Sequence, residues 1–451
     1  MSFPGYPEYK DSRVPWLGEV PASWSVERFR HVFRESGEKI ENEVVGPMLS
    51  VSGYRGIEVK EYDDENRRRL DEELIGYRIV RPGQLVVNTM WLNYAGLGVS
   101  DHEGHVSPAY RSYWIEREVD RRYIHHLMRS SIYVQGYTRL LTGIRPNSLQ
   151  MSRDDLMDFP VIIPPPSDQA AIAAFLDRET AKIDALVAEQ ERLIALLKEK
   201  RQAVISHAVT KGLNPHAPMK DSGIEWLGEI PAHWEICRLK HVVQKTDGLQ
   251  MGPFGGMLTS LAAEQTGFKL YGQENTISGD FERGARWITS SQYEEMARYA
   301  LLPGDMVLTR KGSLGACRLV PPDIQPGIAD SDTVRIRLDH GFIEADFAVS
   351  LMKDAAYVAT QVDLTKRGAI LAGLNTSVIA NLVFALPPLG EQFQISSYLE
   401  SLREQFGELI SESQAAITLL QERRAALISA AVTGKIDVRG LVDASSELEA
   451  A

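Results

Sequence analysis

The sequence predicts an α+β protein: two mixed α/β domains separated by two long helices that form an antiparallel coiled coil, with the halves related by a pseudo-twofold internal repeat. Three observations lead to this prediction. A Trp-Leu-Gly-Glu segment occurs twice, and a helical segment with heptad spacing follows each copy. The chain of 451 residues is also longer than one hydrophobic core usually organises.

The first repeated segment lies near the start of each half. Residues 9–33 read YKDSRVPWLGEVPASWSVERFRHVF, and residues 219–243 read MKDSGIEWLGEIPAHWEICRLKHVV. Lys10 recurs as Lys220 and Val32 as Val242, at a constant offset of 210 residues. Self-similarity over this length indicates a duplicated framework.

The second repeated segment is helical. Its copies begin at Pro164 and Pro387, an offset of 223, so the second half is 13 residues longer between the two segments. Capping and acidic residues follow each Pro-Pro pair, and no proline interrupts residues 169–211 or 392–435. At 1.5 Å per residue, each helix is expected to be roughly 60 Å long.

The apolar residues of both helices repeat at intervals of seven, three and four, which is the spacing of a coiled-coil seam. The predicted seam consists of Leu176, Ile183, Leu186, Leu193, Leu197 and Val204 in the first copy, and of Leu399, Phe406, Leu409, Ala416, Leu420 and Leu427 in the second. An antiparallel pair is the simplest arrangement and acts as a spacer. The alternative is two separate helices, each packed on its own domain or used in an oligomer.

These repeats divide the chain into five parts. We expect mixed domains in residues 1–163 and 214–386, long helices in residues 164–213 and 387–438, and a disordered tail in residues 439–451. The segments between the repeats, residues 34–160 and 244–384, are called the middles here and are hard to align with each other. Even so, residues 81–87 (RPGQLVV) and 302–308 (LPGDMVL) both predict a turn that leads into a strand. Two unrelated turn–strand units are the alternative. Residues 334–337 predict a further strand, and residues 121–133 and 346–357 predict helices.

Each middle holds side chains suited to reading DNA. Asn, Gln and Arg make bidentate hydrogen bonds to base edges, Lys and Arg contact phosphates, and aromatic rings stack. The candidates are Arg67, Arg68, Arg69, Trp91, Asn93, Tyr94, Arg145 and Asn147 in the first middle, and Gln250, the 252–255 loop, Gln273, Asn275, Arg310, Lys311, Lys366 and Arg367 in the second. Singly each is weak, because an arginine triplet is usually a solvated face and a lone Trp is usually core.

Composition narrows the class of protein. The net charge of -12 counts against a generally basic nucleic-acid binder, although a groove can be basic on an acidic body. The two cysteines, Cys237 and Cys317, supply neither a disulfide framework nor a zinc site. Because no long apolar run or signal peptide is present, we expect a cytoplasmic protein without a membrane span.

Catalytic motifs are missing from the sequence. There is no Asn/Asp-Pro-Pro-aromatic methyltransferase motif, no P-loop, and no HExxH or GxSxG pattern. A nuclease core fails as well, because Pro322-Asp323 lacks the acidic-x-Lys partner. The pairs His102 with His105 and His125 with His126 lack a carboxylate or Cys partner at metal-ligand spacing. The sequence therefore points to a chain without catalysis of its own.

The motifs resemble the specificity subunit of type I restriction-modification enzymes, the HsdS family. The resemblance covers about residues 9–439 and rests on the paired Trp-Leu-Gly-Glu-(Val/Ile)-Pro-Ala-x-Trp segments, the Pro-Pro-x-x-(Asp/Glu)-Gln helix starts, and the helix ends at 201–210 and 424–433. In the second middle, Gly252-Pro253-Phe254-Gly255-Gly256 and Tyr271-Gly272-Gln273-Glu274-Asn275 are similar to one common type of target-recognition domain. Ser167-Asp168-Gln169 departs from the family's usual Glu before Gln, which puts little in doubt.

The resemblance implies a mechanism. Each target-recognition domain would read one half of a bipartite, asymmetric site in double-stranded DNA, while the helices set the gap and dock two methyltransferase subunits. Those subunits and the restriction subunits would use S-adenosylmethionine, ATP and Mg²⁺, and this chain would bind no cofactor. The alternatives are a stand-alone DNA methyltransferase or nuclease, and a duplicated coiled-coil scaffold.

Overall fold

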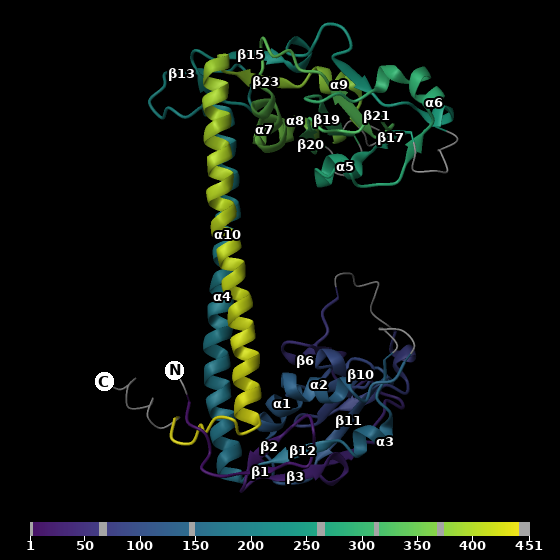
Figure 1. Ribbon diagram of the computed structural model, residues 1–451, viewed down its shortest axis with the longest axis vertical. Helices are drawn as coiled ribbons and strands as arrows, with labels where there is room; N and C mark the ends of the chain where they lie inside the picture. The colour runs from purple at the N-terminus through teal and green to yellow at the C-terminus, as the bar shows by residue number, and fades with distance from the viewer. Residues whose placement is uncertain are drawn as a thin grey trace. The chain divides into compact units, whose positions relative to one another are not determined.

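The computed structural model describes residues 3–62, 70–143, 149–258, 267–310, 315–367 and 374–441. The chain forms two compact units (Figure 1). Unit 1 consists of Met1–Glu191 together with Gln414–Ala451, and unit 2 consists of Arg192–Ser413. Unit 1 is therefore discontinuous in sequence, and unit 2 is a single stretch.

Unit 1 begins with the first repeated segment. Its strands β1 (Tyr9–Asp11) and β2 (Glu19–Pro21) form a hairpin, and β3 (Ser25–Arg28) pairs with β12 (Pro160–Ile163). A four-stranded antiparallel sheet follows, in the order β4 (Phe33–Glu35), β11 (Tyr110–Ile115), β8 (Leu85–Asn88), β9 (Leu97–Val99). Smaller ladders join β5 (Leu49–Ser52) to β6 (Gly56–Val59) and β7 (Arg78–Val80) to β10 (Gly104–Val106). The α-helices of this middle are α1 (Arg121–Arg129), α2 (Ser131–Thr138) and α3 (Arg153–Met157).

Unit 2 repeats this framework. The hairpin β13 (Met219–Asp221) with β14 (Glu229–Pro231) and the pair β15 (Glu235–Arg238) with β23 (Val383–Leu386) correspond to those of unit 1. Its four-stranded sheet has the order β16 (Leu249–Met251), β22 (Thr333–Ile336), β19 (Met306–Thr309), β20 (Cys317–Leu319). A second sheet is its own addition: β18 (Trp287–Ile288), β17 (Phe268–Tyr271) and β21 (Gly327–Ala329). The α-helices are α5 (Gln273–Ser278), α6 (Ser290–Glu295), α7 (Ala345–Asp354), α8 (Ala356–Arg367) and α9 (Thr376–Ala380).

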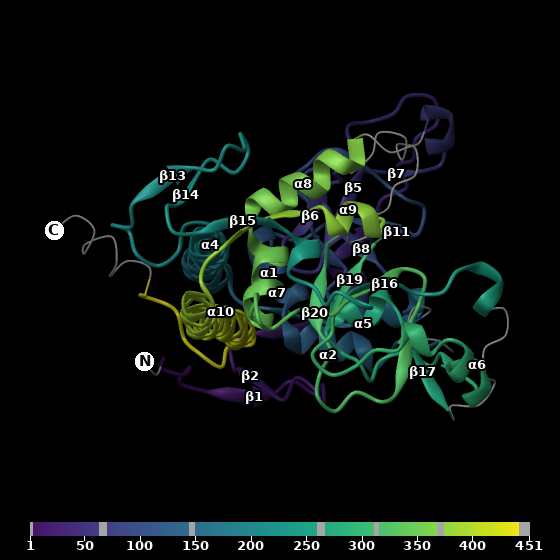
Figure 2. The ribbon, with the colours of Figure 1, turned by 90° about the horizontal axis from the view of Figure 1, so that it is seen from above.

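Each middle contains a four-stranded sheet of the same strand order, and the two similar Pro-Gly segments lie at equivalent places in these sheets. Strands β8 and β19, which follow the two Pro-Gly turns, occupy the same place in matching strand orders. The helices after the sheets match as well, since α7 lies against β20 in unit 2 (Figure 2) and α1 lies against β9 in unit 1. The hydroxyl of Tyr133 in α2 accepts from Ile162 N at 3.0 Å, and that of Tyr357 in α8 accepts from Ala385 N at 3.1 Å. The interpretation as a turn–strand repeat is confirmed.

The cores explain why the repeated residues recur. Trp24 and Trp234 are fully buried, each in the main cluster of its unit. At the helix starts, Gln169 donates to Pro164 O and accepts from Asp120 N, and Gln392 donates to Pro387 O and accepts from Glu344 N, all at 2.8 Å. Because these amides are buried, the hydrogen bonds fix the start of each long helix against its own domain.

The two predicted long helices are present as α4 (Pro166–Lys211) and α10 (Leu389–Val432). The expected end of the second helix at residue 438 is wrong, since α10 ends at Val432 and Gly434 adopts a φ of 72°. Glycine tolerates this left-handed conformation, which stops a helix. Within unit 1 the start of α4 lies beside the end of α10, where Asp184 pairs with Arg424.

The predicted seam is partly wrong. Leu176, Ile183 and Leu399 are buried, and Leu197, Val204, Phe406, Leu420 and Leu427 are half-buried, as expected. Leu186, Leu193 and Leu409 are instead exposed, because burial on α4 follows Leu176, Thr180, Ile183 and Val187, and on α10 it includes Ser413 and Ile417. Thr180 tolerates burial because its hydroxyl donates to Leu176 O at 2.6 Å.

The expected tail is also shorter than predicted. Arg439 pairs with Asp437 at 2.7 Å and lies 4.6 Å from the centre of the Tyr6 ring, and Leu441 O accepts from Arg178. Residues 442–451 lie outside the described residues. In the part of the chain that the structure describes, no helix is both long and apolar enough to span a membrane.

Candidate nucleic-acid interface

Two loops in matching positions carry the predicted DNA-contacting residues. One connects β8 to β9 over residues 89–96, and the other connects β19 to β20 over residues 310–316. Both leave a strand that is buried along its whole length, and both are closed by main-chain bonds, Asn88 N to Gly96 O and Thr309 N to Ala316 O. A buried strand thus holds each loop at the edge of its sheet.

The unit 1 loop displays two aromatic rings. Leu92 is buried beneath the loop, whereas Trp91 and Tyr94 are 56% and 59% exposed with their rings 6.0 Å apart. Gly96 permits the tight turn, because a Cβ there would lie 2.6 Å from Trp91 O. Exposed rings on an anchored loop suit stacking or apolar contacts with bases. Asn93 is less accessible than the two rings, since its Oδ1 is buried and has no hydrogen-bond partner among the described residues.

Arg129 of α1 fixes this loop to the neighbouring β5–β6 turn. Its guanidinium donates to the carbonyls of Ala95 and Leu97 in the loop, at 3.2 and 2.6 Å, and to those of Ser52 and Gly53 in the turn, at 3.2 and 2.9 Å. Burial, and then the charge of Arg424, lower the pKa of Arg129 to about 10. The arginine remains charged at neutral pH.

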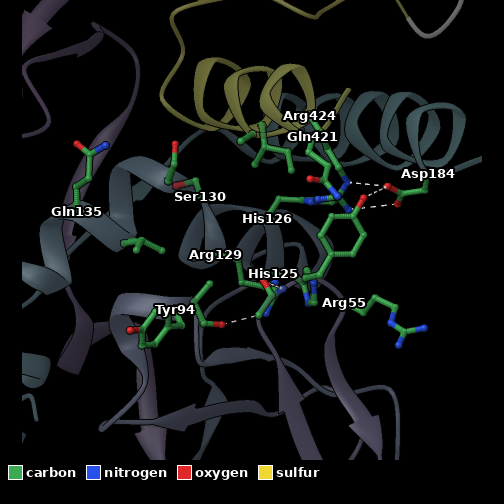
Figure 3. A pocket seen from close by; sticks show the side chains of 17 residues that line it. Arg55, Tyr94, His125, His126, Arg129, Ser130, Gln135, Asp184, Gln421 and Arg424 are labelled. Carbon is green, nitrogen blue, oxygen red and sulfur yellow. Dashed lines mark hydrogen bonds and ion pairs between the residues drawn. The ribbon is translucent and has the colours of Figure 1, made fainter. Parts of the chain in front are cut away.

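A cavity of about 670 Å³ lies beside the β5–β6 turn, the first residues of α2 and the helices α4 and α10 of unit 1 (Figure 3). On one wall, the Tyr54 hydroxyl donates to Asp184 at 2.5 Å, and the Arg424 guanidinium lies 4.7 Å from the Tyr54 ring centre. Tyr94 and Gln135 lie on the opposite side. Burial lowers the pKa of His125 to about 3, so this lining imidazole is neutral.

Arg310 is the described side chain of the unit 2 loop. It donates to Leu374 O at 3.2 Å and to Ser331 O at 3.3 Å, and it lies 5.6 Å from the ring centre of Phe254, which is 51% exposed. Gly252 brings the segment of Phe254 close, because a Cβ there would lie 1.9 Å from Asp330 O. Three segments distant in sequence therefore meet around one arginine.

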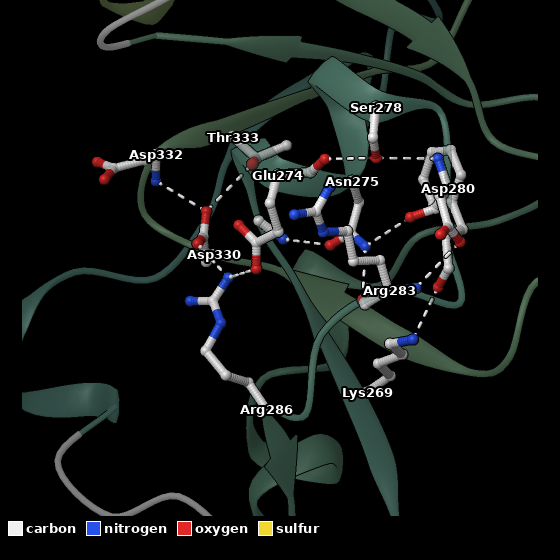
Figure 4. Close-up of polar contacts among 12 residues, drawn as sticks. Lys269, Glu274, Asn275, Ser278, Asp280, Arg283, Arg286, Asp330, Asp332 and Thr333 are labelled. Atoms are coloured by element: carbon white, nitrogen blue, oxygen red, sulfur yellow. Dashed lines mark hydrogen bonds and ion pairs between the residues drawn. The ribbon is translucent and has the colours of Figure 1, made fainter. Parts of the chain in front are cut away.

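A polar network joins the neighbouring residues of unit 2, including Asp330 next to Ser331 (Figure 4). Arg286 bridges Glu274 at 2.8 Å and Asp330 at 3.0 Å. Asp330 also accepts from Asp332 N and the Thr333 hydroxyl, so it shapes the turn next to Ser331. Burial raises the pKa of Asp330 despite these contacts.

One predicted DNA contact serves the protein itself. Asn275 is buried, accepts from Gly272 N and donates to Asp280 O and Arg283 O, so both of its amide hydrogens are bound within the protein and neither is left for a base. The assignment of Asn275 to DNA is a misreading of a structural amide. Gln250 donates to the adjacent Met251 O at 2.7 Å, whereas Gln273 is half-buried at the start of α5.

Other predicted contacts cannot be placed. Arg67, Arg68, Arg69, Arg145, Asn147 and Lys311 lie outside the described residues, and so do the side chains of Lys366 and Arg367 at the end of α8. Sequence reasoning missed Arg129, Arg286 and Tyr54. The sequence holds no signal for the first two, since an arginine that binds main-chain carbonyls has the same spacing as a solvated one.

Metal chemistry finds no support in the described part of the chain, where no three His, Cys, Asp or Glu side chains gather as a metal site. His126 instead pairs with Asp177 at 2.9 Å, and the rings of His125 and His126 are 5.8 Å apart.

Comparison with known proteins finds similarity to one kind of protein. No family model matches the chain. It is 27% identical over 342 residues to the StySPI specificity subunit of a type I restriction enzyme from Salmonella potsdam, an alignment that covers 71% of this chain and 66% of that relative. The chain is thus similar to specificity subunits of type I restriction enzymes. The aligned part spans slightly less than two thirds of that relative's own length.

Solved structures agree on the specificity-subunit fold. The HsdS subunit from Thermoanaerobacter tengcongensis superposes with a TM-score of 0.51 and 15% identity, over 92% of this chain and 98% of that one. A chain from a study of complex assembly and conformational transition in a type I restriction-modification system superposes with a TM-score of 0.69 and 15% identity, over 92% and 99%.

Proposed function

We propose that this chain is the DNA sequence-recognition subunit of a type I restriction-modification complex, and that each unit reads one half of a bipartite, asymmetric site. The observation that carries the proposal is the repeated sheet, whose equivalent loops display different chemistry. Unit 1 offers Trp91 and Tyr94, and unit 2 offers Arg310 with Phe254. One framework with two reading surfaces suits a site whose halves differ.

The long helices serve as a spacer in this proposal. We infer that α4 and α10 pair along their length as an antiparallel coiled coil, with a pseudo-twofold axis relating the units, so that helix length sets the gap between the half-sites. The pairing of Asp184 with Arg424 in unit 1 supports it. At 1.5 Å per residue, the 46 residues of α4 span roughly 69 Å, or about two helical repeats of DNA at roughly 34 Å each.

The exposed faces of the helices suit protein partners. Leucines that the seam leaves uncovered lie on both helices: Leu186, Leu193 and Leu196 on α4, and Leu409 and Leu419 on α10. Apolar side chains in such a row favour association with another protein. We propose that they contribute to docking two methyltransferase subunits, with restriction subunits completing the complex. S-adenosylmethionine, ATP and Mg²⁺ would then act in those partners.

A domain exchange tests the proposal. Residues 34–160 are replaced by the corresponding segment of another family member with a known, different site, and methylated adenines are sequenced in a host that expresses the complex. One half of the methylated sequence is expected to change while the other half stays. An unchanged sequence from an assembled, active complex contradicts the proposal.

A second measurement separates the rival functions. The double variant Arg310→Ala/Lys311→Ala is expected to lose DNA affinity while still assembling with the methyltransferase subunits. A scaffold without DNA contacts predicts no change in either property. A stand-alone methyltransferase or nuclease predicts that the purified chain methylates or cuts DNA without partners.

A further inference from the structure

The cavity of unit 1 contains a cation without a carboxylate of its own. Arg129 donates only to main-chain carbonyls, and no carboxylate in the described residues hydrogen-bonds to it. Burial of a cation is costly when only neutral oxygens compensate the lost hydration. An anion in the cavity would balance this charge.

The remaining lining leaves the cavity positive. Besides Arg129 it contains Arg55, which pairs with Glu58 at 2.7 Å, and Arg424, which pairs with Asp184 at 2.9 Å. Asp184 is shared, because it accepts from both Arg424 and Tyr54. Two of the three arginines therefore have a carboxylate partner, and Arg129 is the one to which no carboxylate in the described residues hydrogen-bonds.

Further hydrogen-bonding groups are free to meet a ligand. No side chain caps the start of α2, where Ser130 and Ser131 line the cavity. Within the described part of the chain, the side-chain amides of Gln135 and Gln421 make no hydrogen bond, although both line the cavity. Main-chain N–H groups at a helix start bind phosphate oxygens well.

The size and the aromatic side chains narrow the ligand. A volume of about 670 Å³ is within the range of pockets that enclose a molecule of nucleotide size. Tyr54 and Tyr94 line the cavity beside the arginines, so a flat base and a phosphate both find partners. We propose that this cavity binds a nucleotide, with its phosphate near Arg129 and Arg424 and its base near Tyr94, Gln135 and Gln421.

A hollow beside α7 in unit 2 lacks the same capacity. It is lined by Val349, Ser350 and Lys353 of α7, but its volume is only about 390 Å³. Its helix arginine, Arg403, is already bound to Ser350 at 2.8 Å and to Asp354 at 3.1 Å. The proposal therefore predicts one nucleotide site per chain.

The test adds two negative charges to the cavity with little change in side-chain size. The double variant Gln135→Glu/Gln421→Glu is compared with Gln414→Glu, a matched change at an exposed glutamine of α10 outside the cavity. Calorimetric titration of the full chain with adenosine 5′-monophosphate is expected to show one site. The double variant is expected to weaken binding at least about tenfold, because like charges repel at this range, and Gln414→Glu is expected to leave it unchanged.

A second arm identifies the source of the nucleotide. If adenosine 5′-monophosphate does not bind, but the double variant alone lowers affinity for duplex DNA of random sequence, the nucleotide belongs to DNA and the proposal stands in that form. If neither ligand distinguishes the double variant from Gln414→Glu, the proposal is overturned. The result is independent of the domain exchange above, which reports on sequence reading even when this cavity is empty.

Discussion

The β8–β9 and β19–β20 loops occupy the same place in two matching sheets but are stabilised differently. In unit 1 an arginine outside the loop, Arg129, holds the loop carbonyls, and the exposed groups are aromatic. In unit 2 the arginine belongs to the loop itself, and Arg310 binds carbonyls of two other segments. The comparison teaches that the sheet fixes where a reading loop lies, and that its chemistry is free to differ.

The repeated tryptophans test the shared framework with the largest expected effect. Trp24→Ala and Trp234→Ala are each expected to destabilise their own unit by about 3–5 kcal/mol, since both side chains are fully buried. Urea denaturation combined with hydrogen exchange of each unit measures this. A loss in one unit only would show that the two frameworks are not energetically equivalent.

The indole N–H groups of Trp24 and Trp234 differ in their hydrogen bonding. Trp24 Nε1 donates to Asp168 at 3.2 Å, whereas Trp234 Nε1 has no partner in the described residues. Trp24→Phe is therefore expected to cost about 1 kcal/mol more than Trp234→Phe. Equal costs would contradict a stabilising role for the hydrogen bond to Asp168.

The paired helix-start glutamines are the next test. Gln169→Ala and Gln392→Ala each leave buried main-chain groups without partners, and each is expected to cost about 2 kcal/mol. Chemical denaturation measures the loss, and Gln414→Ala at an exposed position is the control, with an expected change below about 0.5 kcal/mol. Costs no larger than those of the control would contradict a role in fixing the helix starts.

Variants of the two loops are expected to differ in how their affinity for DNA depends on salt concentration. Trp91→Ala and Arg310→Ala are each expected to weaken DNA binding about tenfold, which is the usual size of one stacking or arginine contact. Only Arg310→Ala is expected to reduce the salt dependence, by about one unit of the logarithmic slope, if the arginine meets a phosphate. Fluorescence anisotropy at several salt concentrations measures both quantities.

Stability provides the control for that experiment. Trp91 is exposed, so Trp91→Ala is expected to change the free energy of unfolding by less than about 0.5 kcal/mol. Identical salt slopes for the two variants would show that the loops contact DNA in the same way.

Acid sensitivity gives the smallest expected difference between the units. The hydrogen bond from His126, and then the charge of Arg122, lower the pKa of Asp177 in the folded state. A lowered folded pKa stabilises unit 1 above the unfolded value of about 3.9, and this contribution is lost as the pH falls through the folded pKa. Glu400, the matching residue of α10, makes no ion pair with the described residues of unit 2.

The corresponding variant is Asp177→Asn. The denaturant concentration at the unfolding midpoint of unit 1 is expected to fall less between about pH 5 and pH 2 in the variant than in the native chain. The midpoint of unit 2 is expected to be the same in both. A native-like acid response in Asp177→Asn would remove this carboxylate as the cause.

The sequence is most informative about the parts that recur. Identical residues at 210 and 223 positions apart predict the hairpins, the helix starts and the buried tryptophans, because a packed core restricts what can replace them. Leucine spacing does not decide the helix register, since Thr180 satisfies its own hydroxyl and takes a buried position while Leu186 remains exposed. Sequence also cannot separate Asn275 from a base-reading asparagine, because a main-chain turn and an adenine edge use the same amide chemistry.

The discontinuity of unit 1 sets an order for biosynthesis. Its core contains Ile428, Val432 and Val438, Tyr9 donates to Gly434 O, and Pro4 O accepts from Asp437 N at 2.7 Å. The first part of the chain to leave the ribosome must therefore wait, with its apolar surface incomplete, until residues near 440 emerge. Unit 2, a single stretch from Arg192 to Ser413, has all of its core available earlier. The half that is made second is thus able to finish folding first.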